Sequence, residues 1–391
     1  MENAPHHNDR EGLQRADTTS AVLPGTSPSQ STASRPRLWF VDNLRILLIS
    51  LVVLHHTAAT YSGIPAWYYT EKPTSGVVAL GLTVFLLVNQ AWFMGAFFLL
   101  SGYFTPGAYD RKGPRAFLRD RLIRLGVPLV VFYFLLNPIL YAGFYGSGSP
   151  LDFYLHTIGS GPLWFVLALL VLDGSYAALR LATRKRPARS RTPQPPTYPM
   201  VIGFVLVLAL TTYVLRIAIP VGFTVPVIGF PSSAYLPQYV SFFVLGTVAY
   251  RRGWFHAITA RMGRVGLGMA IGATLVFLPL ALAGRWEGHG TLSSLCYALW
   301  DSTFAVGIVL ALLTCFRRRL DTQGPLRRYL SAHVFTVYVI HAFVVTAAGY
   351  ALSVLDLPTL VKFAIAAVVV LPVCFTLAGP IRRLPGVRHV L

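Results

Sequence analysis

Residues Arg37–His56 read RLWFVDNLRILLISLVVLHH. The stretch begins with polar and charged residues, among them Asp42 and Arg45, and continues as an apolar run. A helix that crosses the hydrocarbon core of a bilayer needs roughly 20 mostly apolar residues. We therefore predict a membrane-spanning helix over Leu44–Tyr61, with Asp42 and Arg45 at one membrane surface.

The composition of the whole chain agrees with this prediction. Of its 391 residues, 54% are hydrophobic and only 12% are charged. A soluble protein carries about 25% charged residues, which solvate its surface. A chain with so little charge cannot cover itself in water, so we expect the lipid bilayer to surround it.

Apolar stretches of spanning length recur along the chain and are separated by polar breaks. This pattern predicts an all-α integral membrane protein with about ten transmembrane helices. The predicted spans are Leu44–Tyr61, Val77–Phe104, Leu122–Tyr145, Pro162–Leu181, Met200–Pro220, Ala234–Tyr250, Val265–Ala283, Leu295–Phe316, His333–Leu355 and Thr359–Ile381.

The basic residues indicate how these spans are oriented. All of the 33 Lys and Arg residues lie on one side of the predicted membrane, except Lys72, Arg216, Arg285 and Lys362. Because Lys and Arg concentrate in cytoplasmic loops, we expect the N-terminus and the C-terminus in the cytoplasm. The net charge of +19 is then a consequence of topology, and we expect no nucleic-acid partner.

The ends and the cysteines add little chemistry. Residues 1–36 are polar and rich in Ser, Thr, Pro and His, which predicts a disordered cytoplasmic tail. Residues 37–391 form the predicted multi-pass transmembrane domain. The three cysteines, Cys296, Cys315 and Cys374, lack the spacing of a zinc site or a disulfide framework, and we expect no metal site.

Ionisable residues inside the predicted spans are candidates for function, because burying them in a membrane is costly. Arg45 and His56 are eleven residues apart, so they share one helix face and lie about 16 Å apart along it. Asp173 lies about 15 Å from the outer edge of its span, and His341 about 12 Å from the inner edge of its own. Both could meet His56 at mid-depth, where a carboxylate and two imidazoles suit proton transfer.

Structural interpretations of the same residues remain open. Asp42 and Arg45 can form an ion pair that sets the depth of the helix. His55 points about 100° away from His56 and can hydrogen-bond a neighbouring helix, and His56 itself can be structural. Asp301 fits either a contact between helices or an acceptor site.

Five sequence motifs, in order along the chain, resemble those of the acyltransferase family 3 membrane proteins. Arg45 and His56 match an Arg-x10-His pattern in the family's first span, and Arg121 and Arg124 match its paired arginines. An LWF element without a following Glu resembles the subgroup that includes the glucan-modifying proteins. The matching segments are Arg37–His56, Phe97–Phe104 (FFLLSGYF), Arg119–Leu129 (RDRLIRLGVPL), Pro162–Leu170 (PLWFVLALL) and Val337–Phe343 (VYVIHAF).

This resemblance implies that residues 37–391 are an acyltransferase domain in the cytoplasmic (inner) membrane of a bacterium. The family moves an acyl group from cytoplasmic acyl-CoA to a hydroxyl of a glycan or of another extracytoplasmic or lipid-linked acceptor. Acyl-CoA is then a substrate, and no permanently bound cofactor is expected. The acyl group, the acceptor and the oligomeric state are not determined by the sequence.

The residues can be given roles within that reaction. Arginine forks recognise phosphate well, so Arg45, Arg121 and Arg124 are the expected donor-binding residues. His56 is the expected general base on the acceptor hydroxyl, with transient acyl transfer to His56 as the alternative. Asp173 and His341 are the expected catalytic partners that orient His56 or relay protons.

Two other classes of protein share these features. A proton-coupled secondary transporter or exporter also has many spans, helices broken by Pro and Gly, and His and Asp at mid-depth. A membrane-embedded scaffold would share the topology but would leave His56, Asp173 and His341 without a role.

Overall fold

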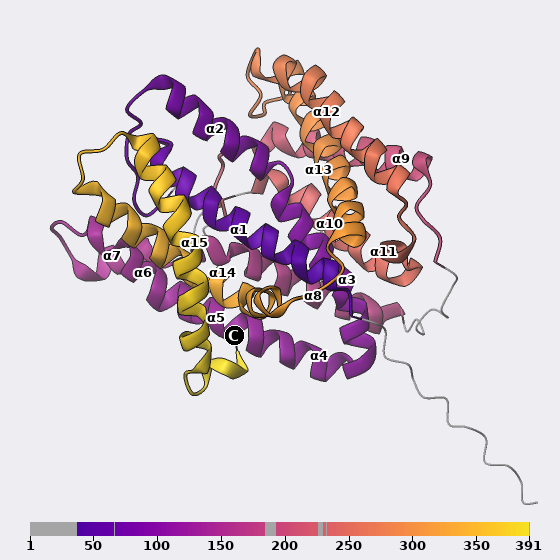
Figure 1. The fold of residues 1–391 in the computed structure, drawn as a ribbon, viewed down its shortest axis with the longest axis horizontal. Helices are drawn as coiled ribbons and strands as arrows, with labels where there is room; N and C mark the ends of the chain where they lie inside the picture. The colour runs from indigo at the N-terminus through magenta and orange to yellow at the C-terminus, as the bar shows by residue number, and fades with distance from the viewer. Residues whose placement is uncertain (1–36, 66, 184–192, 226–229, 232, 391) are drawn as a thin grey trace, which may run out of the picture. The chain divides into compact units, whose positions relative to one another are not determined.

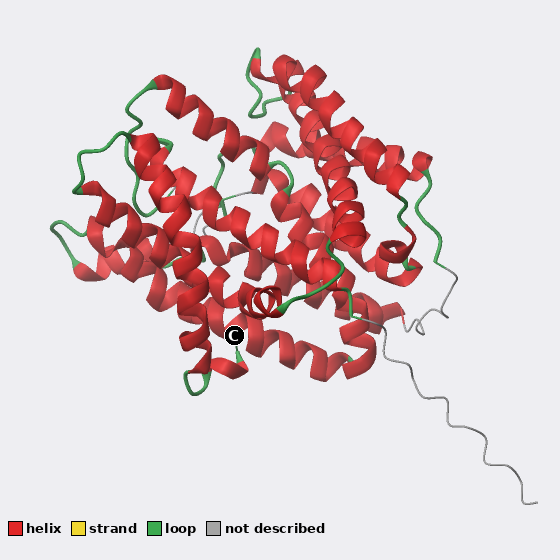
Figure 2. Cartoon of the chain, viewed as in Figure 1, coloured by secondary structure: helices red, strands yellow, loops and turns green. Residues whose placement is uncertain are grey.

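The computed structural model describes residues 37–65, 67–183, 193–225, 230–231 and 233–390. The tail predicted over residues 1–36 lies outside the described residues. Contacts divide the chain into Met1–Arg37 and a compact unit, Leu38–Leu391, which contains all of the described helices. The described residues of this unit form no named strand; Val225 and Phe230 make one isolated bridge (Figure 2).

Nine helical segments of the described chain are long and apolar enough to cross a membrane, which confirms the predicted all-α membrane fold. Three of them are composite, and the others are single helices. They are α1 (Trp39–Tyr61), α2–α3 (Gly76–Lys112), α4–η3 (Pro114–Phe144), α7–α8 (Pro150–Thr183), α9 (Tyr198–Ala218), α12 (Ala260–Leu282), α13 (Leu292–Arg319), α14 (Pro325–Ser353) and α15 (Thr359–Arg383).

The sixth predicted span forms α10 (Leu236–Arg252), which at 17 residues is shorter than these nine segments and is not one of them. It packs along α3 (Phe93–Lys112) at a very close crossing. A Cβ atom on Gly102 would lie 2.1 Å from the carbonyl oxygen of Phe243, and one on Gly246 would lie 2.2 Å from that of Leu99. Only glycine therefore lets these two backbones approach as they do. Short segments flank α10: η5 (Ser233–Tyr235) and α11 (Trp254–Ala257).

The second span is interrupted in its middle. It consists of α2 (Gly76–Gln90), which ends before Ala91, and α3, which begins after Trp92. The break leaves the buried carbonyl oxygen of Ala91 to a partner from another helix, and the Gln238 side chain donates a hydrogen bond to it (Nε2–O 2.7 Å). In a membrane, a broken helix is tolerated where a neighbouring helix satisfies the freed backbone groups in this way.

The third span is irregular because it contains prolines. A π-helical turn, η1 (Leu122–Gly126), precedes α5 (Val127–Val131), which has Pro128 in its first turn; a second, η2 (Phe132–Leu136), precedes α6 (Asn137–Tyr141). Proline cannot donate the helical hydrogen bond, and a wider turn accommodates the loss. The remaining elements of this part are α4 (Pro114–Arg121), η3 (Ala142–Phe144), α7 (Pro150–Thr157), η4 (Gly161–Leu163) and α8 (Trp164–Thr183).

Helix α1 lies in the middle of the compact unit (Figure 1). It packs against α2, α13, α14 and α15. Of the residues in its most apolar stretch, 56% are buried, compared with 22% for α12. Because α1 carries both Arg45 and His56, its central place surrounds these residues with several other helices. A short segment, η6 (Val387–His389), follows α15.

Candidate active site

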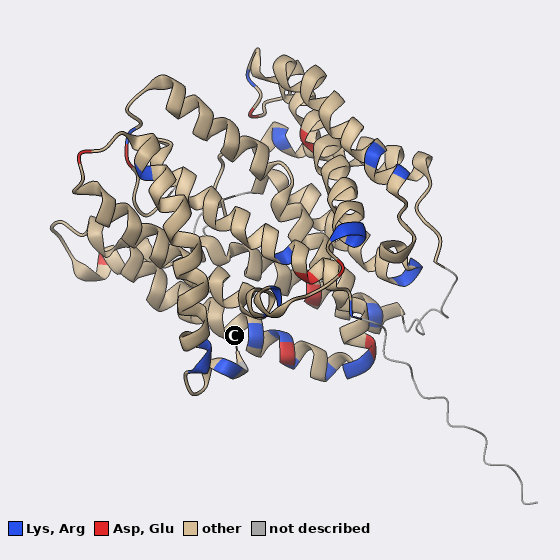
Figure 3. Cartoon of the chain, in the orientation of Figure 1, with Lys and Arg blue, Asp and Glu red and all other residues tan. Residues whose placement is uncertain are grey.

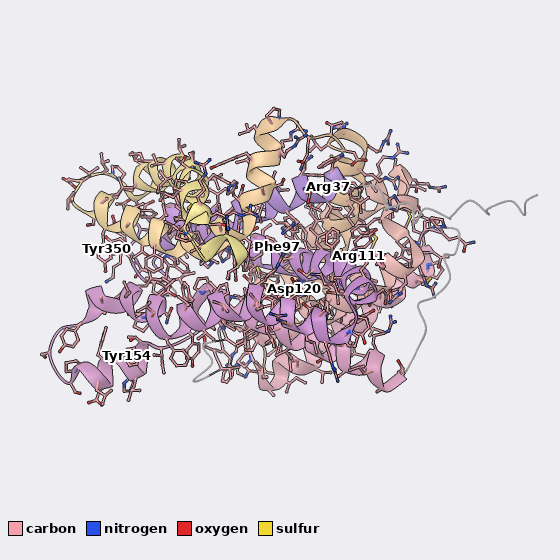
Figure 4. The ribbon with its side chains drawn as sticks, turned by 90° about the horizontal axis from the view of Figure 1, so that it is seen from below. Arg37, Phe97, Arg111, Asp120, Tyr154 and Tyr350 are labelled. Atoms are coloured by element: carbon pink, nitrogen blue, oxygen red, sulfur yellow. The ribbon has the colours of Figure 1, made fainter. Side chains whose placement is uncertain are left out.

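A pocket of about 470 Å³ brings together all three arginines predicted to bind the donor. Arg45 comes from α1, Arg121 from α4 and Arg124 from η1, and a fourth arginine, Arg382, comes from α15. Figure 4 labels Phe97, which lines the same pocket. We call this cavity the arginine pocket. We call the end of the helices at which its arginines lie the basic end. Figure 3 shows most of the described Lys and Arg residues along the lower and right-hand side of the view, which includes this end.

Three of these arginines have carboxylate partners. Arg121 Nε lies 3.0 Å from Asp173 Oδ2, and Arg124 Nε lies 3.2 Å from Asp120 Oδ1. Arg45 and Asp42 form a looser i, i+3 pair at 3.9 Å. Each pair holds a guanidinium at the pocket while other nitrogens of the same group can reach a ligand, because a guanidinium carries five N–H donors.

Asp173 does not meet His56, contrary to the sequence-based expectation. Its Oδ1 accepts a hydrogen bond from Thr105 Oγ1 (2.7 Å), and its Oδ2 pairs with Arg121. Asp173 lies nine residues after Trp164, the first residue of α8, which is about 14 Å along the helix towards the basic end. It therefore supports the arginine pocket instead of the histidines.

His341 and His56 do come together. Helix α14 begins at Pro325, eight residues before the apolar run predicted to start at His333. His341 therefore lies about 24 Å from the start of its helix and about 12 Å from the start of that apolar run. Its ring stacks on that of His56, with the centroids 5.1 Å apart and an interplanar angle of 27°.

The hydrogen bonds of His341 define where it can accept a proton. Its Nδ1 lies 2.6 Å from the carbonyl oxygen of Tyr338, so Nδ1 donates and the lone pair of the neutral ring is on Nε2. This Nε2 atom is buried and has no hydrogen-bond partner among the residues that the structure describes. An imidazole nitrogen in that state is available to accept a proton.

An aromatic ring covers His56, and His55 has different neighbours. Trp67, from the loop between α1 and α2, stacks on the ring of His56 at 3.9 Å between centroids. His55 points elsewhere: Asn89 Nδ2 lies 3.3 Å from its Nδ1, and Phe93 stacks on its ring at 5.2 Å. His55 therefore bridges α1 to α2 and α3, while His56 faces His341.

Tyr338 connects the arginine pocket to the histidines. It lines the pocket, its ring stacks on His341 at 5.8 Å, and its hydroxyl donates a hydrogen bond to the carbonyl oxygen of Pro162. The pocket wall between the arginines and Tyr338 is largely apolar and includes Ile49 and Phe165. The site thus consists of a cationic opening, an apolar passage and an imidazole pair beyond its far end.

Sequence reasoning missed three of these residues as parts of a site. Tyr338 belongs to the VYVIHAF motif, so its signal was present but only His341 was singled out. Arg382 was counted among the basic residues that set topology. Trp67 lies in a loop and carries no sequence signal, because nothing in its neighbourhood predicts that it contacts His56.

Asp301 takes part in a separate buried cluster. It accepts a hydrogen bond from Arg216 Nη2 (2.6 Å), and the guanidinium of Arg216 lies between the rings of Tyr235 (4.7 Å) and Tyr297 (4.9 Å). The exposed fractions of the two charged side chains are 0% and 2%. This geometry links α9 to α13. No group of three or more His, Cys, Asp or Glu that could hold a metal ion occurs within the described ranges.

Comparisons with known proteins identify the family. A family model described as an acyltransferase domain matches residues 38–379. The glucans biosynthesis protein C of Salmonella paratyphi B is 24% identical over 335 residues, which cover 80% of this chain and 83% of that protein. The same protein of Salmonella dublin and of Salmonella enteritidis is similar to the same extent.

No solved structure matches the protein. The family model covers most of the chain, including every residue of the arginine pocket and the histidine pair except Arg382 and Val390. A family of acyltransferases also distinguishes this protein from the transporter and scaffold classes that share its topology. The chain is a multi-pass membrane acyltransferase and belongs to the acyltransferase 3 family.

Proposed function

We propose that this enzyme transfers an acyl group from cytoplasmic acyl-CoA to a hydroxyl of a glycan or of another extracytoplasmic or lipid-linked acceptor. One observation carries the proposal. Arginines from α1, α4 and η1 line one pocket, and the far end of that pocket is formed by Tyr338, whose ring stacks on His341 beside His56.

The arginine pocket suits the donor by charge and by size. CoA carries several phosphate groups, and guanidinium groups bind phosphate through paired hydrogen bonds. A volume of about 470 Å³ lies in the range of about 300–1,000 Å³ that is usual for small-molecule sites. The apolar wall formed by Ile49, Phe97 and Phe165 would accommodate the uncharged pantetheine arm, which would then carry the thioester towards Tyr338 and the histidines.

The imidazole pair supplies the proton chemistry of acyl transfer. His56 would take the proton of the acceptor hydroxyl while the hydroxyl oxygen attacks the thioester carbonyl carbon. A C–O bond forms, the C–S bond breaks, and the CoA thiolate receives the proton from His56. His341, whose buried Nε2 can accept a proton, would relay protons for His56. In the alternative mechanism, His56 carries the acyl group itself as a covalent intermediate.

The two ends of the site would face different compartments. The basic end would face the cytoplasm of a bacterium, where acyl-CoA is made, because basic residues favour that side. The acceptor would approach from the side of the loop that carries Trp67, since this ring covers His56 there. A glycan acceptor agrees with the name of the Salmonella relatives, which are glucans biosynthesis proteins.

The proposal is tested by acyl-CoA turnover with purified protein. Radiolabelled acetyl-CoA and succinyl-CoA are supplied, and CoA release is measured for the wild type and for His56→Ala. General acid–base catalysis contributes about 10²–10⁴-fold to rate, so we expect the variant to lose about 10³-fold in CoA release at unchanged yield and thermal stability.

The matched control is His156→Ala, because His156 is an exposed histidine on α7 that lies 2.6 Å from the backbone oxygen of Asp152 and does not line the arginine pocket. This variant is expected to keep wild-type turnover. Wild-type turnover by His56→Ala would refute the role of His56. Failure of well-folded wild-type protein to bind or cleave any of several acyl-CoA donors would refute acyl-CoA as the donor.

A further inference from the structure

A second pocket, of about 480 Å³, lies at the basic end between α14 and α15. Arg382, Arg383 and Arg388 line it, together with Tyr329 and His333. We call it the phosphate pocket. It is next to the arginine pocket, because Arg382 lines both.

The position of Arg382 between the pockets is held by the backbone. Its Nη1 donates a hydrogen bond to the carbonyl oxygen of Ala332 (2.6 Å), and Ala332 itself lines the arginine pocket. One guanidinium is thereby directed at the boundary of the two cavities. A ligand that extends from one pocket into the other would pass this group.

Both pockets are lined by basic residues, and no Asp or Glu of the described chain lines either of them. Around the arginine pocket, Arg45, Arg121 and Arg124 each have an aspartate within 3.9 Å. The phosphate pocket gathers three arginines that lie within seven residues of the chain, Arg382, Arg383 and Arg388. A lining of one sign of charge concentrates a positive field in the cavity, and it favours a multiply charged anion.

One wall of the phosphate pocket is aromatic. The rings of Tyr329 and His333 lie 4.3 Å apart at an angle of 38°. The Tyr329 hydroxyl donates to the carbonyl oxygen of Phe375 (2.8 Å), and a Cβ on Gly379 would lie 2.8 Å from that hydroxyl. These contacts seat the ring directly against α15. Aromatic side chains of this kind stack with purine bases.

We propose that the phosphate pocket binds the 3′-phosphorylated adenosine end of acyl-CoA, while the pantetheine arm occupies the arginine pocket. Arg383 and Arg388 would contact the 3′-phosphate, Arg382 would contact the diphosphate at the boundary, and Tyr329 with His333 would face the adenine. This inference rests on the proposed function, because it names a subsite for the same donor. It makes the C-terminal arginines determinants of donor specificity.

The test compares two donors that differ only in the 3′-phosphate. KM and kcat for acyl-CoA and for the same thioester of dephospho-CoA are measured with the wild type and with Arg383→Gln/Arg388→Gln. The wild type is expected to show a KM about tenfold higher for the dephospho donor. The double variant should raise KM for acyl-CoA about tenfold, because a hydrogen bond to a charged group changes affinity by a factor of about this size. It should leave KM for the dephospho donor within about twofold and leave kcat unchanged.

A charge-matched control separates the pocket from general electrostatics. Arg318→Gln/Arg319→Gln removes the same charge from the end of α13, and neither residue lines either pocket. This variant should keep the wild-type preference for acyl-CoA. An equal rise in KM in the control and the pocket variant would overturn the inference.

Other outcomes have distinct meanings. If Arg383→Gln/Arg388→Gln still prefers acyl-CoA over the dephospho donor as the wild type does, the 3′-phosphate binds elsewhere and the inference is wrong, although acyl-CoA remains the donor. If the variant lowers activity equally for both donors, and only in nanodiscs that contain phosphatidylglycerol instead of phosphatidylcholine alone, the pocket binds a lipid headgroup and the inference is wrong. If the wild type releases CoA from neither donor, the proposed function fails first.

Discussion

Two buried ion pairs in this protein have the same chemistry and different surroundings. In the pair Arg121–Asp173, the carboxylate is 1% exposed, but the arginine is 22% exposed and lines a pocket of about 470 Å³. In the pair Arg216–Asp301, both side chains are at most 2% exposed, and two tyrosine rings cover the guanidinium.

A charge inside a membrane protein therefore does not by itself mark a functional site. Arg216 and Asp301 satisfy each other within packed helices, so this pair contributes to how α9 and α13 fit together. Arg121 is held from behind by Asp173 and presents its other side to a cavity. A cavity beside a supported charge, rather than burial alone, distinguishes a group that can bind a ligand.

The largest expected effect comes from breaking the fully buried pair Arg216–Asp301. Asp301→Ala leaves the charge of Arg216 buried without its partner, which typically costs about 3–5 kcal/mol. We expect a correspondingly lower free energy of unfolding and a low yield of folded protein, measured by thermal unfolding of the purified protein. The double variant Arg216→Met/Asp301→Leu should regain most of the stability, because it removes both charges. No recovery in the double variant would show that the pair is needed for more than packing.

The next largest effect is expected from Arg121, which lines the arginine pocket, together with its neighbour Arg124. Arg121→Ala/Arg124→Ala removes two phosphate-binding groups, and each charge-assisted hydrogen bond is worth about 1.5–3 kcal/mol. We expect KM for acyl-CoA to rise about a hundredfold, with the free energy of unfolding changed by much less than in Asp301→Ala. Steady-state kinetics and thermal unfolding on the same preparations check this. Unchanged affinity for the donor would move the donor site elsewhere.

The smallest effect sharpens the role of Asp173. Asp173→Asn keeps a side chain that can accept the hydrogen bond from Thr105, but it removes the charge that holds Arg121. We expect KM for acyl-CoA to rise about tenfold with kcat and its pH profile unchanged, because the residue acts through Arg121. A lower kcat with a shifted pH profile would instead support the sequence-based prediction that Asp173 orients His56.

Much of the fold follows from local sequence. The spanning helices are long apolar runs, so hydropathy identifies them and places their boundaries within a few residues in cases such as α15, predicted at Thr359–Ile381 and found at Thr359–Arg383. Where a helix extends beyond its apolar run, hydropathy does not detect the extension. Helix α14, for example, starts eight residues before the predicted span.

The candidate site was predicted in part. The shared face of Arg45 and His56 follows from helical geometry within one helix, and it needs no knowledge of neighbours. The grouping of Arg45, Arg121 and Arg124 was expected from the family resemblance, and the structure brings them to one pocket. The prediction that Asp173 meets His56 was wrong. Counting residues from a membrane edge gives the depth of a residue along its own helix, and it does not say which side chain of another helix lies at that depth.

The sequence alone determined that this protein is a helical membrane protein, where nine of its ten predicted spans lie, and that Arg45 and His56 share one face of the first helix. Tertiary structure alone decided that Asp173 supports Arg121, that Trp67 covers His56, and that Arg382 joins two pockets. The physical reason is that hydropathy and charge act residue by residue along the chain. Apolar helix surfaces can pack against one another in many ways, and only close contacts such as Gly102 against Phe243 select one of them.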